Sequence, residues 1–293
     1  MDDNELLSDR FEENRLRLRD IAYRMLGSLS EAEDAVQESW IRLSRADTSD
    51  VKNFDGWLTT VVARVCLNVL RARRVRREVA VEEAEKADRE YGSGPENEAI
   101  LADSVGLALL VVLDTLSPAE RLAFVLHDMF AVPFDELATI VGRSPTSTRQ
   151  LASRARRRVQ GKPAKAPTDL ARQRKLVDAF LAAARSGNFD ALLVVLDPDI
   201  IFRVDPSVVP NGSQSEIRGS RNVAGQAVAF SGRAPFTQLA LVNGEVGVVV
   251  APWGKLLMAG IFVFDLTRNA ILEIDLIADS QRLQQLDFGV LDD

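Results

Sequence analysis

Apolar side chains recur at helical spacing in several segments of the first 161 residues, and the clearest pattern lies near the end of this stretch. One helix that ends at Gly142 places Leu137 and Val141 on the same face. A second helix is predicted to begin directly afterwards, because Ser144 suits the N-cap and Pro145 the first helical position. Two helices joined by so short a turn predict a helix-turn-helix.

The second helix of this pair has one apolar and one polar face. Leu151, Ala155 and Val159 repeat toward a core, while basic residues fall on the other side. Because Arg and Gln can pair bidentately with G or A, we expect Arg149 and Gln150 to read bases and later arginines to hold phosphates. The candidate DNA-contacting residues are Thr146, Ser147, Arg149, Gln150, Ser153, Arg154, Arg157 and Arg158. The alternative interpretation is an arginine-rich face exposed only to solvent.

Three helices are predicted before residue 80. The first spans 9–25 and stops at Gly27, and the second starts at a capping box of Ser30 and Glu33. The third runs from Gly56, with an apolar first half and a second half rich in arginine. Such a helix is compatible with DNA contact and also with basic side chains that simply reach solvent.

Two stretches lack apolar periodicity and predict linkers. Residues 79–100 are acidic and contain glycine, and residues 162–168 combine proline with lysine. Between them, a helix over 101–116 and a second helix capped by Ser117 and Glu120 lead into the helix-turn-helix. These helices are therefore expected to form one compact domain with it.

The remaining residues change from helical spacing to a mixed pattern. An amphipathic helix is predicted over 171–188 and a short helix over 221–231. Four apolar segments then alternate with turn sequences such as NG and TRN, which predicts four strands of an antiparallel meander. Helices followed by such a sheet indicate an α+β domain.

Composition narrows the possible chemistry. The 293 residues carry a formal net charge of −7, so any nucleic-acid binding must rest on local basic faces. With a single cysteine, Cys66, and a single histidine, His127, the chain offers no cysteine-based zinc site and no histidine-dependent catalysis elsewhere. Both are expected to be structural residues in apolar helices. No cofactor or metal is expected, and neither a signal-like start nor a bilayer-length apolar run is found, which predicts a cytoplasmic protein.

The helical segments resemble a known family. The stretches LGSLSEAEDAVQESWIRLSR and FDGWLTTVVARVCLNVLRARR are similar to region 2 of the extracytoplasmic-function sigma factors of the sigma-70 family. The stretch LSPAERLAFVLHDMFAVPFDELATIVGRSPTSTRQLASRARRRV resembles region 4 of that family. This resemblance covers residues 9–161. It implies two partners, namely core RNA polymerase, bound through its beta-prime clamp helices and beta flap, and promoter DNA.

The same resemblance implies roles for residues. Asp34, Gln37 and Glu38 would dock on the polymerase, the loop 46–55 would hold an extruded −10 base, and the helix-turn-helix would read the −35 element. The acidic linker would thread through the polymerase. Unstacking a base costs free energy that capture of the base and basic side chains along the single strand would offset. The candidate −10 residues are Trp57, Arg64, Asn68, Arg71, Arg73, Arg74, Arg76 and Arg77. A place in the hydrophobic core is an equally good interpretation for Trp57.

The C-terminal segment resembles the SnoaL-like, ketosteroid-isomerase-like cone of cystatin type, which is fused to one subgroup of these sigma factors. Such a cone encloses a pocket, so a small-molecule ligand becomes a candidate partner. The candidate polar pocket residues are Arg203, Asp205, Trp253, Asp265 and Asp275. Surface or structural hydrogen-bonding roles are the alternative for each. The loop 210–220 lacks the glycine run of the subgroup, so the regulatory interface of the subgroup is not transferred to this chain. No acid–base pair is identified, so an enzyme is not expected.

The sequence therefore predicts a multidomain protein, in which two all-α sigma modules, the second with a helix-turn-helix, precede an α+β SnoaL-like domain. The expected segments are region 2 at 9–78, the acidic linker at 79–100, region 4 at 101–161, a linker at 162–168, the SnoaL-like regulatory domain at 169–281 and a tail at 282–293. The expected function is promoter-specific transcription initiation under the control of the C-terminal domain. Two rival hypotheses are a one-component helix-turn-helix regulator with a ligand-sensing domain, and an enzyme with a DNA-binding appendage.

Overall fold

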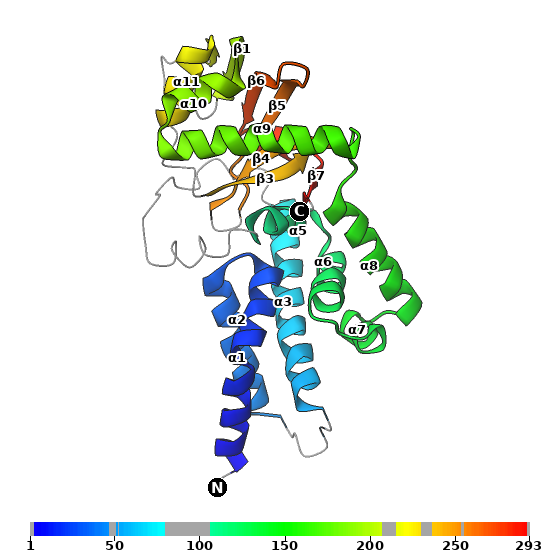
Figure 1. Cartoon of the computed structure of the whole chain (residues 1–293). Helices are drawn as coiled ribbons and strands as arrows, with labels where there is room; N and C mark the ends of the chain where they lie inside the picture. Colours follow the sequence, from blue (N-terminus) through cyan, green and yellow to red (C-terminus); the bar gives the residue numbers. More distant parts are fainter. Residues whose placement is uncertain are drawn as a thin grey trace. The chain divides into compact units, whose positions relative to one another are not determined.

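The computed structural model divides the chain into two compact units (Figure 1). The N-terminal unit comprises Met1–Ser93 and Leu113–Arg156, and the C-terminal unit comprises Gly94–Val112 and Arg157–Asp293. The structure describes residues 3–46, 51, 53–79, 106–206, 215–229, 236–252 and 255–291. The predicted acidic linker therefore lies outside the described residues from residue 80 onward.

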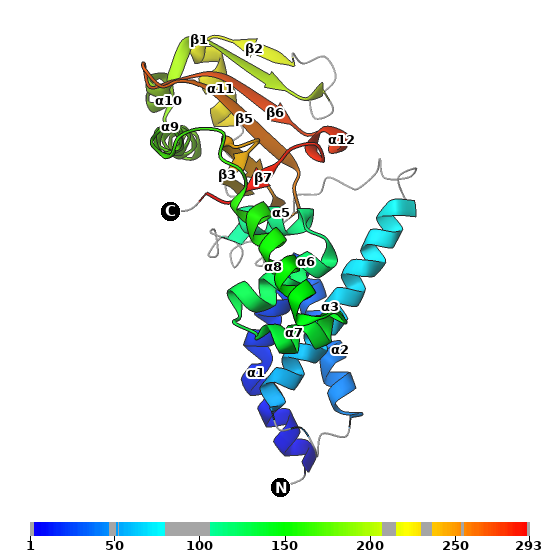
Figure 2. The same ribbon diagram turned by 90° about the vertical axis from the view of Figure 1, so that its right-hand side faces the viewer.

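Three long helices build the first part of the N-terminal unit (Figure 2). They are α1 (Asp3–Leu26), α2 (Leu29–Leu43) and α3 (Phe54–Val79). Leu18, Ile21 and Leu58 are fully buried where these helices pack together. Cys66 is also buried, as predicted, and its desolvation raises the pKa of the thiol to about 12.

The start of α2 corrects one prediction. The N-cap is Ser28, whose hydroxyl accepts from the Glu31 N–H, and the expected capping box at Ser30 is wrong. Gly27 adopts a φ of 74°, a left-handed conformation that turns the chain sharply after α1. Ser28 is then the extended residue directly before the helix, which is the N-cap position.

Between residues 106 and 160 the structure describes five helical elements. They are α5 (Gly106–Thr115), α6 (Pro118–Ala123), the π-helix η2 (Phe124–Met129), α7 (Phe134–Val141) and α8 (Pro145–Gln160). The predicted capping box is present, because Ser117 Oγ accepts from the Glu120 N–H and Glu120 Oε2 accepts from the Ser117 N–H. His127 is structural as predicted, since its Nδ1 hydrogen-bonds the Val132 carbonyl at 2.9 Å.

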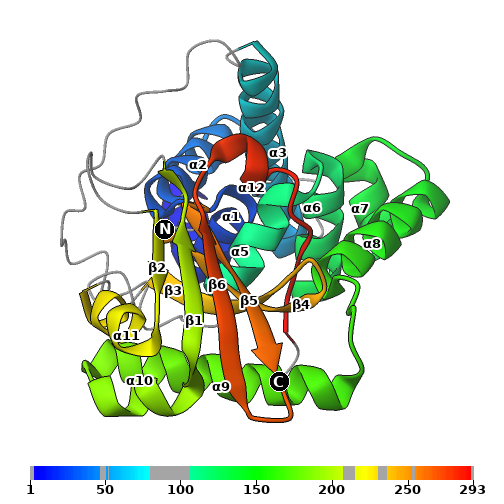
Figure 3. The same ribbon diagram turned by 90° about the horizontal axis from the view of Figure 1, so that it is seen from above.

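The C-terminal unit combines helices with one curved sheet (Figure 3). Its helices are α9 (Pro167–Ser186), α10 (Phe189–Val195), α11 (Ser220–Ala229) and the short α12 (Ser280–Leu283). The strands are β1 (Leu196–Val204), β2 (Glu216–Arg218), β3 (Thr237–Val242), β4 (Glu245–Val250), β5 (Met258–Asp265), β6 (Ala270–Ile277) and β7 (Phe288–Gly289). The sheet order is β2-β1-β6-β5-β4-β3-β7. The predicted α+β architecture is therefore confirmed.

The predicted meander corresponds to β3 through β6, which pair antiparallel in chain order. Its first turn is the Asn243–Gly244 pair, with φ values of 53° and 82° at successive residues. The sequence pattern did not predict β1, which pairs parallel with β6. An apolar run of this length fits a helix or a strand, and here α10 ends and β1 begins within the run.

Alternation along β1 and β6 assigns side chains to the two faces of the sheet. Phe202 and Ile274 are buried on the face covered by α9 to α11, and they are cross-strand partners. Arg203 and Asp275 are the next pair of partners and point to the opposite face, because successive strand residues alternate. The hydrophobic core of this unit therefore lies between the helices and one face of the sheet.

Candidate nucleic-acid interface and C-terminal cavity

The helix-turn-helix has the predicted local geometry. Gly142 ends α7 with a φ of 73°, and its N–H donates to the Ala138 carbonyl at 2.9 Å. Ser144 Oγ accepts from the Ser147 N–H at 3.2 Å directly before α8, whose first residue is Pro145. The apolar faces of both helices are buried, so the turn fixes how α8 presents its other face.

The outward face of α8 carries the predicted DNA-contacting residues. Thr146, Arg149, Gln150, Ser153, Arg154, Arg157 and Arg158 are exposed, and Ser147 is half-buried. The Arg149 guanidinium lies 5.4 Å from the centroid of the Phe134 ring, which orients it by a cation–π contact. Arg154 Nε donates to Glu120 Oε1 at 3.1 Å, so this arginine also holds α8 against α6.

A second exposed stripe follows α3. Arg64, Asn68 and Arg71 are exposed at positions i, i+4 and i+7, which lie on one helix face, and Arg74 is exposed beyond them. Arg73 is different, because it donates to the Leu26 carbonyl at 2.9 Å and pairs with Glu31. The side chains of Arg76 and Arg77 lie outside the described residues.

Trp57 stands at the start of α3. Its ring is half-buried and stacks on Phe54, with 6.4 Å between centroids and 19° between planes. This position is compatible with both interpretations of the residue, packing and contact with a base. Residues 47–50 and 52 of the predicted base-binding loop lie outside the described residues.

The predicted polymerase-docking residues follow one face of α2. Asp34 and Gln37 are exposed, and Glu38 is half-buried and pairs with Arg42 at 2.9 Å. Ile41 lies seven residues after Asp34 on the same face, and 36% of the residue is exposed. Sequence reasoning missed Ile41, although its helical spacing from Asp34 was the available signal.

Arg121 of α6 is a buried cation that sequence reasoning also missed. It is 2% exposed, and it donates to the Arg24 carbonyl of α1 at 3.1 Å and to Asp114 at 3.2 Å. Desolvation lowers its pKa to about 10, against the opposing effect of Asp114. Within the N-terminal unit, Arg121 therefore ties the helices before the helix-turn-helix to α1.

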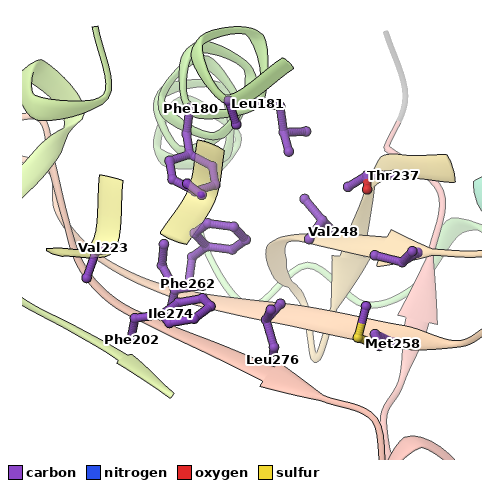
Figure 4. Close-up of a pocket in the computed structure, with 13 residues that line it drawn as sticks. Phe180, Leu181, Phe202, Val223, Thr237, Val248, Met258, Phe262, Ile274 and Leu276 are labelled. Atoms are coloured by element: carbon purple, nitrogen blue, oxygen red, sulfur yellow. The ribbon is translucent and has the colours of Figure 1, made fainter. Parts of the chain in front are cut away.

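The C-terminal unit contains an apolar cavity between α9, α11 and the sheet (Figure 4). The cavity has a volume of about 90 Å³. The larger hollow, which includes the solvent at the open mouth, has a volume of about 680 Å³. The lining residues are Phe180, Leu181, Ala184, Phe202, Val223, Ala227, Thr237, Val248, Val250, Met258, Phe262, Ile274 and Leu276. Thr237 is the only polar residue among these lining residues.

The four predicted polar pocket residues that the structure describes are not among the lining residues of this cavity. Arg203 lies on the opposite face of the sheet and donates to Glu216 at 3.1 Å, Glu273 at 2.7 Å and Asp275 at 3.4 Å. These hydrogen bonds, that to Glu273 foremost, raise the pKa of Arg203. Arg203 and Asp275 directly follow the lining residues Phe202 and Ile274, so strand alternation points their side chains away from the cavity. The prediction that they line the pocket is therefore corrected for this cavity.

Two other predicted pocket residues stabilise turns. Asp205 accepts from the Asp279 N–H and from Arg282, both at 3.2 Å. Asp265 accepts from Thr267 and Arg268, and these hydrogen bonds hold its pKa far below the usual range. Asp205 and Asp265 are not among the lining residues, so the prediction is also corrected for these two residues and this cavity. Trp253 lies outside the described residues.

Comparison with known proteins agrees with the helical architecture. Residues 10–76 match the family model of sigma-70 region 2, and residues 106–159 match that of sigma-70 region 4. A one-component regulator would leave the region 2 match unexplained, so this alternative is not supported. Together the helix-turn-helix and the two matches define a transcription initiation factor of the sigma-70 type.

Two relatives specify the family. The ECF RNA polymerase sigma factor SigJ of Mycobacterium tuberculosis (strain ATCC 25618 / H37Rv) is 38% identical over 256 residues, which cover 82% of this chain and 80% of that protein. The probable ECF RNA polymerase sigma factor SigI of Mycobacterium tuberculosis (strain CDC 1551 / Oshkosh) is 38% identical over 208 residues, covering 70% of this chain and 72% of that protein. This chain belongs to the ECF RNA polymerase sigma factors, which bind core RNA polymerase and promoter DNA.

One solved structure aligns with most of this chain. The crystal structure of Mycobacterium tuberculosis SigJ covers 94% of this chain and 98% of its own, at 31% identity and a TM-score of 0.46. Among the helices that the structure describes here, none combines the length and apolar character needed to span a bilayer.

Proposed function

We propose that this sigma factor acts in the cytoplasm and reads a two-part promoter through the exposed faces of α8 and α3. On α8, Arg149 and Gln150 would contact bases of the −35 element, and Arg157 and Arg158 would contact phosphates. This assignment rests on their exposure along one helix face, next to a turn that fixes the direction of the helix. The proposed region 4 segment is 101–161.

The −10 element would be held by α3 within a proposed region 2 segment of 9–78. Arg64, Asn68 and Arg71 form an exposed polar stripe that can follow a single-stranded backbone. Trp57 would stack on a base at the start of this stripe. Arg73 is better explained as a structural residue, because the Leu26 carbonyl and Glu31 already occupy its guanidinium.

The core polymerase would dock on the exposed face of α2. Asp34 and Gln37 offer polar contacts there, and Ile41 adds an apolar contact at the same face. An exposed isoleucine flanked by polar residues suits a surface that is covered in a complex. We therefore include Ile41 with Asp34, Gln37 and Glu38 in the proposed docking face.

We further propose that the C-terminal domain, 169–281 with its tail, controls promoter recognition. The observation that carries this proposal is that the last turn of α8 is built into the C-terminal unit. The Val290 N–H beside β7 donates to the Val159 carbonyl at 2.7 Å, and Gly161 packs directly against Gly289. The helix that carries the proposed phosphate contacts is thus bonded at its end to the C-terminal domain.

The start of α5 is bonded to the same unit. The Ala108 N–H donates to Gln238 Oε1 of β3 at 2.8 Å. Beyond α8, the Ala164 N–H donates to the Gly244 carbonyl at 2.8 Å, in the turn between β3 and β4. Residues near both ends of the proposed region 4 therefore have hydrogen bonds within the C-terminal unit, and a ligand or partner of that domain would act on α8 through them.

The test is run-off transcription with purified core polymerase and the Gly289→Ala variant. A Cβ at residue 289 would lie 2.7 Å from the Gly161 Cα and 3.0 Å from its nitrogen, so β7 must move away from the end of α8. Gly225→Ala is the matched control, because a Cβ there meets nothing within 4 Å.

We expect Gly289→Ala to change transcript yield by about five-fold or more, which corresponds to roughly 1 kcal/mol, and Gly225→Ala to match the wild type. A truncation after Lys165 should change the yield in the same direction. Equal yields from all four proteins would show that the C-terminal domain does not control initiation. Failure of every protein to initiate with core polymerase would contradict the promoter assignment itself.

A further inference from the structure

We infer that the cavity of the C-terminal unit binds a small uncharged apolar molecule, a ring or a short alkyl chain, without converting it. This inference deepens the proposed regulatory role of the C-terminal domain and rests on it for its biological meaning. The binding itself follows from the lining of the cavity, which can be tested separately.

The cavity interrupts an otherwise continuous core. Phe180, Phe202, Phe262 and Ile274 belong to the hydrophobic cluster between the helices and the sheet, and they also line the cavity. Protein interiors are packed as densely as organic crystals, so a cavity within a hydrophobic cluster is an exception to close packing. Cavities with apolar walls stay dry and take up apolar molecules instead of water.

The lining excludes charge. Among the lining residues only Thr237 has a polar side chain, and Arg203, Glu273 and Asp275 of β1 and β6 bond to one another on the other face of the sheet. A carboxylate or ammonium group inside would lose its hydration without gaining a partner of opposite charge. The ligand is therefore uncharged where it enters the cavity.

The arrangement of the lining residues also indicates which ligand shapes the cavity can hold. Figure 4 shows Val223 and Phe202 at one end of the cavity and Thr237 at the other. The rings of Phe180 and Phe262 meet edge to face with 6.0 Å between centroids, and Met258 supplies a flexible wall. These walls suit a ring or an alkyl chain, with at most one uncharged polar group at the Thr237 end.

The described lining provides no acid–base pair for catalysis. Carboxylates that sequence reasoning placed in the pocket are engaged elsewhere, Asp205 with Arg282 and Asp265 with Arg268. General acid–base catalysis needs a titratable group within hydrogen-bond reach of the reacting atom. We therefore infer binding without turnover, as expected of a sensor.

The experiment titrates the full chain with aminoanthracene, an uncharged ring compound whose fluorescence rises in apolar surroundings. Octanol and octanoate then compete for the site, because they share one alkyl chain and differ in charge. Ala184→Leu fills the cavity from α9, and Ala182→Leu adds the same side chain at an exposed position of that helix. Ala227→Leu and Ala229→Leu form a second matched pair on α11, in case the first variant does not fold.

We expect saturable binding of one probe per chain, displaced by octanol at least roughly ten-fold better than by octanoate. Each cavity-filling variant should lower the affinity for the probe about ten-fold or more, while its control variant keeps the wild-type affinity. Equal displacement by octanoate would overturn the assignment of an uncharged ligand. Binding that persists in both cavity-filling variants, or no saturable binding to the wild type, would overturn the site.

Transcription assays distinguish this inference from the proposed function. If the probe binds as expected but octanol leaves transcription by the full chain unchanged, the cavity is a binding site and the ligand-controlled role is wrong. If Gly289→Ala changes transcription but no apolar molecule binds, the control by the C-terminal domain stands and the inferred ligand site is wrong.

Discussion

The outward face of α8 and the cavity of the C-terminal unit are opposite kinds of binding surface. The face of α8 is convex and exposed, with arginine, glutamine and hydroxyl side chains. The cavity is concave, and apart from Thr237 its described lining is apolar. The face of α8 would attract DNA electrostatically, over a range that depends on the salt concentration. The cavity would select its ligand by excluding charged groups.

This difference predicts how each surface responds to substitution. On α8, loss of an exposed side chain such as Gln150 would remove a proposed contact with DNA and leave the core unchanged, whereas Arg154 also holds α8 against α6. In the cavity, the binding residues are also the core residues, so a polar substitution affects binding and stability together. The predictions below test this contrast, beginning with the largest expected effect.

A charge placed in the cavity should be the most damaging change. Val248 of β4 is 3% exposed and lines the cavity, so Val248→Asp would bury an unpaired carboxylate and destabilise the C-terminal unit by at least about 3 kcal/mol. Val263→Asp on β5 is the matched control, because Val263 is 44% exposed, and it should cost under about 0.5 kcal/mol. Urea denaturation followed by circular dichroism measures both. Similar losses for the two variants would show that the cavity does not exclude charge.

The same contrast explains which parts of the site could be predicted from the sequence. Helical periodicity separates an outward face from a packed one, and caps and glycines fix the ends, so the exposed positions of Arg149 and Gln150 followed from the pattern. In the sheet, strand position and side-chain type indicated the candidates, and they selected Arg203 although its neighbour Phe202 is the residue that lines the cavity. The face of the sheet to which such a residue points depends on the pairing of β1 with β6. This pairing joins residues about 70 positions apart, so no local sequence pattern predicts it.

Loss of a base-reading side chain should have the next largest effect. Gln150→Ala or Arg149→Ala should lower discrimination at one base pair of the −35 element by about 1–3 kcal/mol. The measurement is transcription by holoenzyme from promoters with single substitutions in that element. Gln160→Ala is the control, since Gln160 is exposed on the same helix beyond the base-reading turns. An unchanged preference in both Gln150→Ala and Arg149→Ala would contradict the assigned reading face.

A phosphate contact should change affinity without changing sequence preference. Arg157 is exposed in the last turns of α8, and Arg157→Gln removes one charge there. Holoenzyme binding should weaken uniformly across promoter variants, and the slope of log affinity against log salt should become shallower by about one. A change confined to one promoter sequence would instead place Arg157 among the base-reading residues.

The smallest expected effect concerns the charge of Asp265, which the structure places in the turn after β5 instead of the cavity. Hydrogen bonds from Thr267, and then from Arg268, depress its pKa in the folded chain, so ionised Asp265 stabilises the fold above the ordinary aspartate pKa of about 4. This contribution is lost as pH falls from there toward the lower pKa of the folded state. Asp265→Asn should therefore melt slightly below the wild type at neutral pH, and the gap should narrow in acid. If the gap stays constant with pH, its cause is the altered turn geometry, whereas a weaker aminoanthracene affinity in this variant would return Asp265 to the cavity.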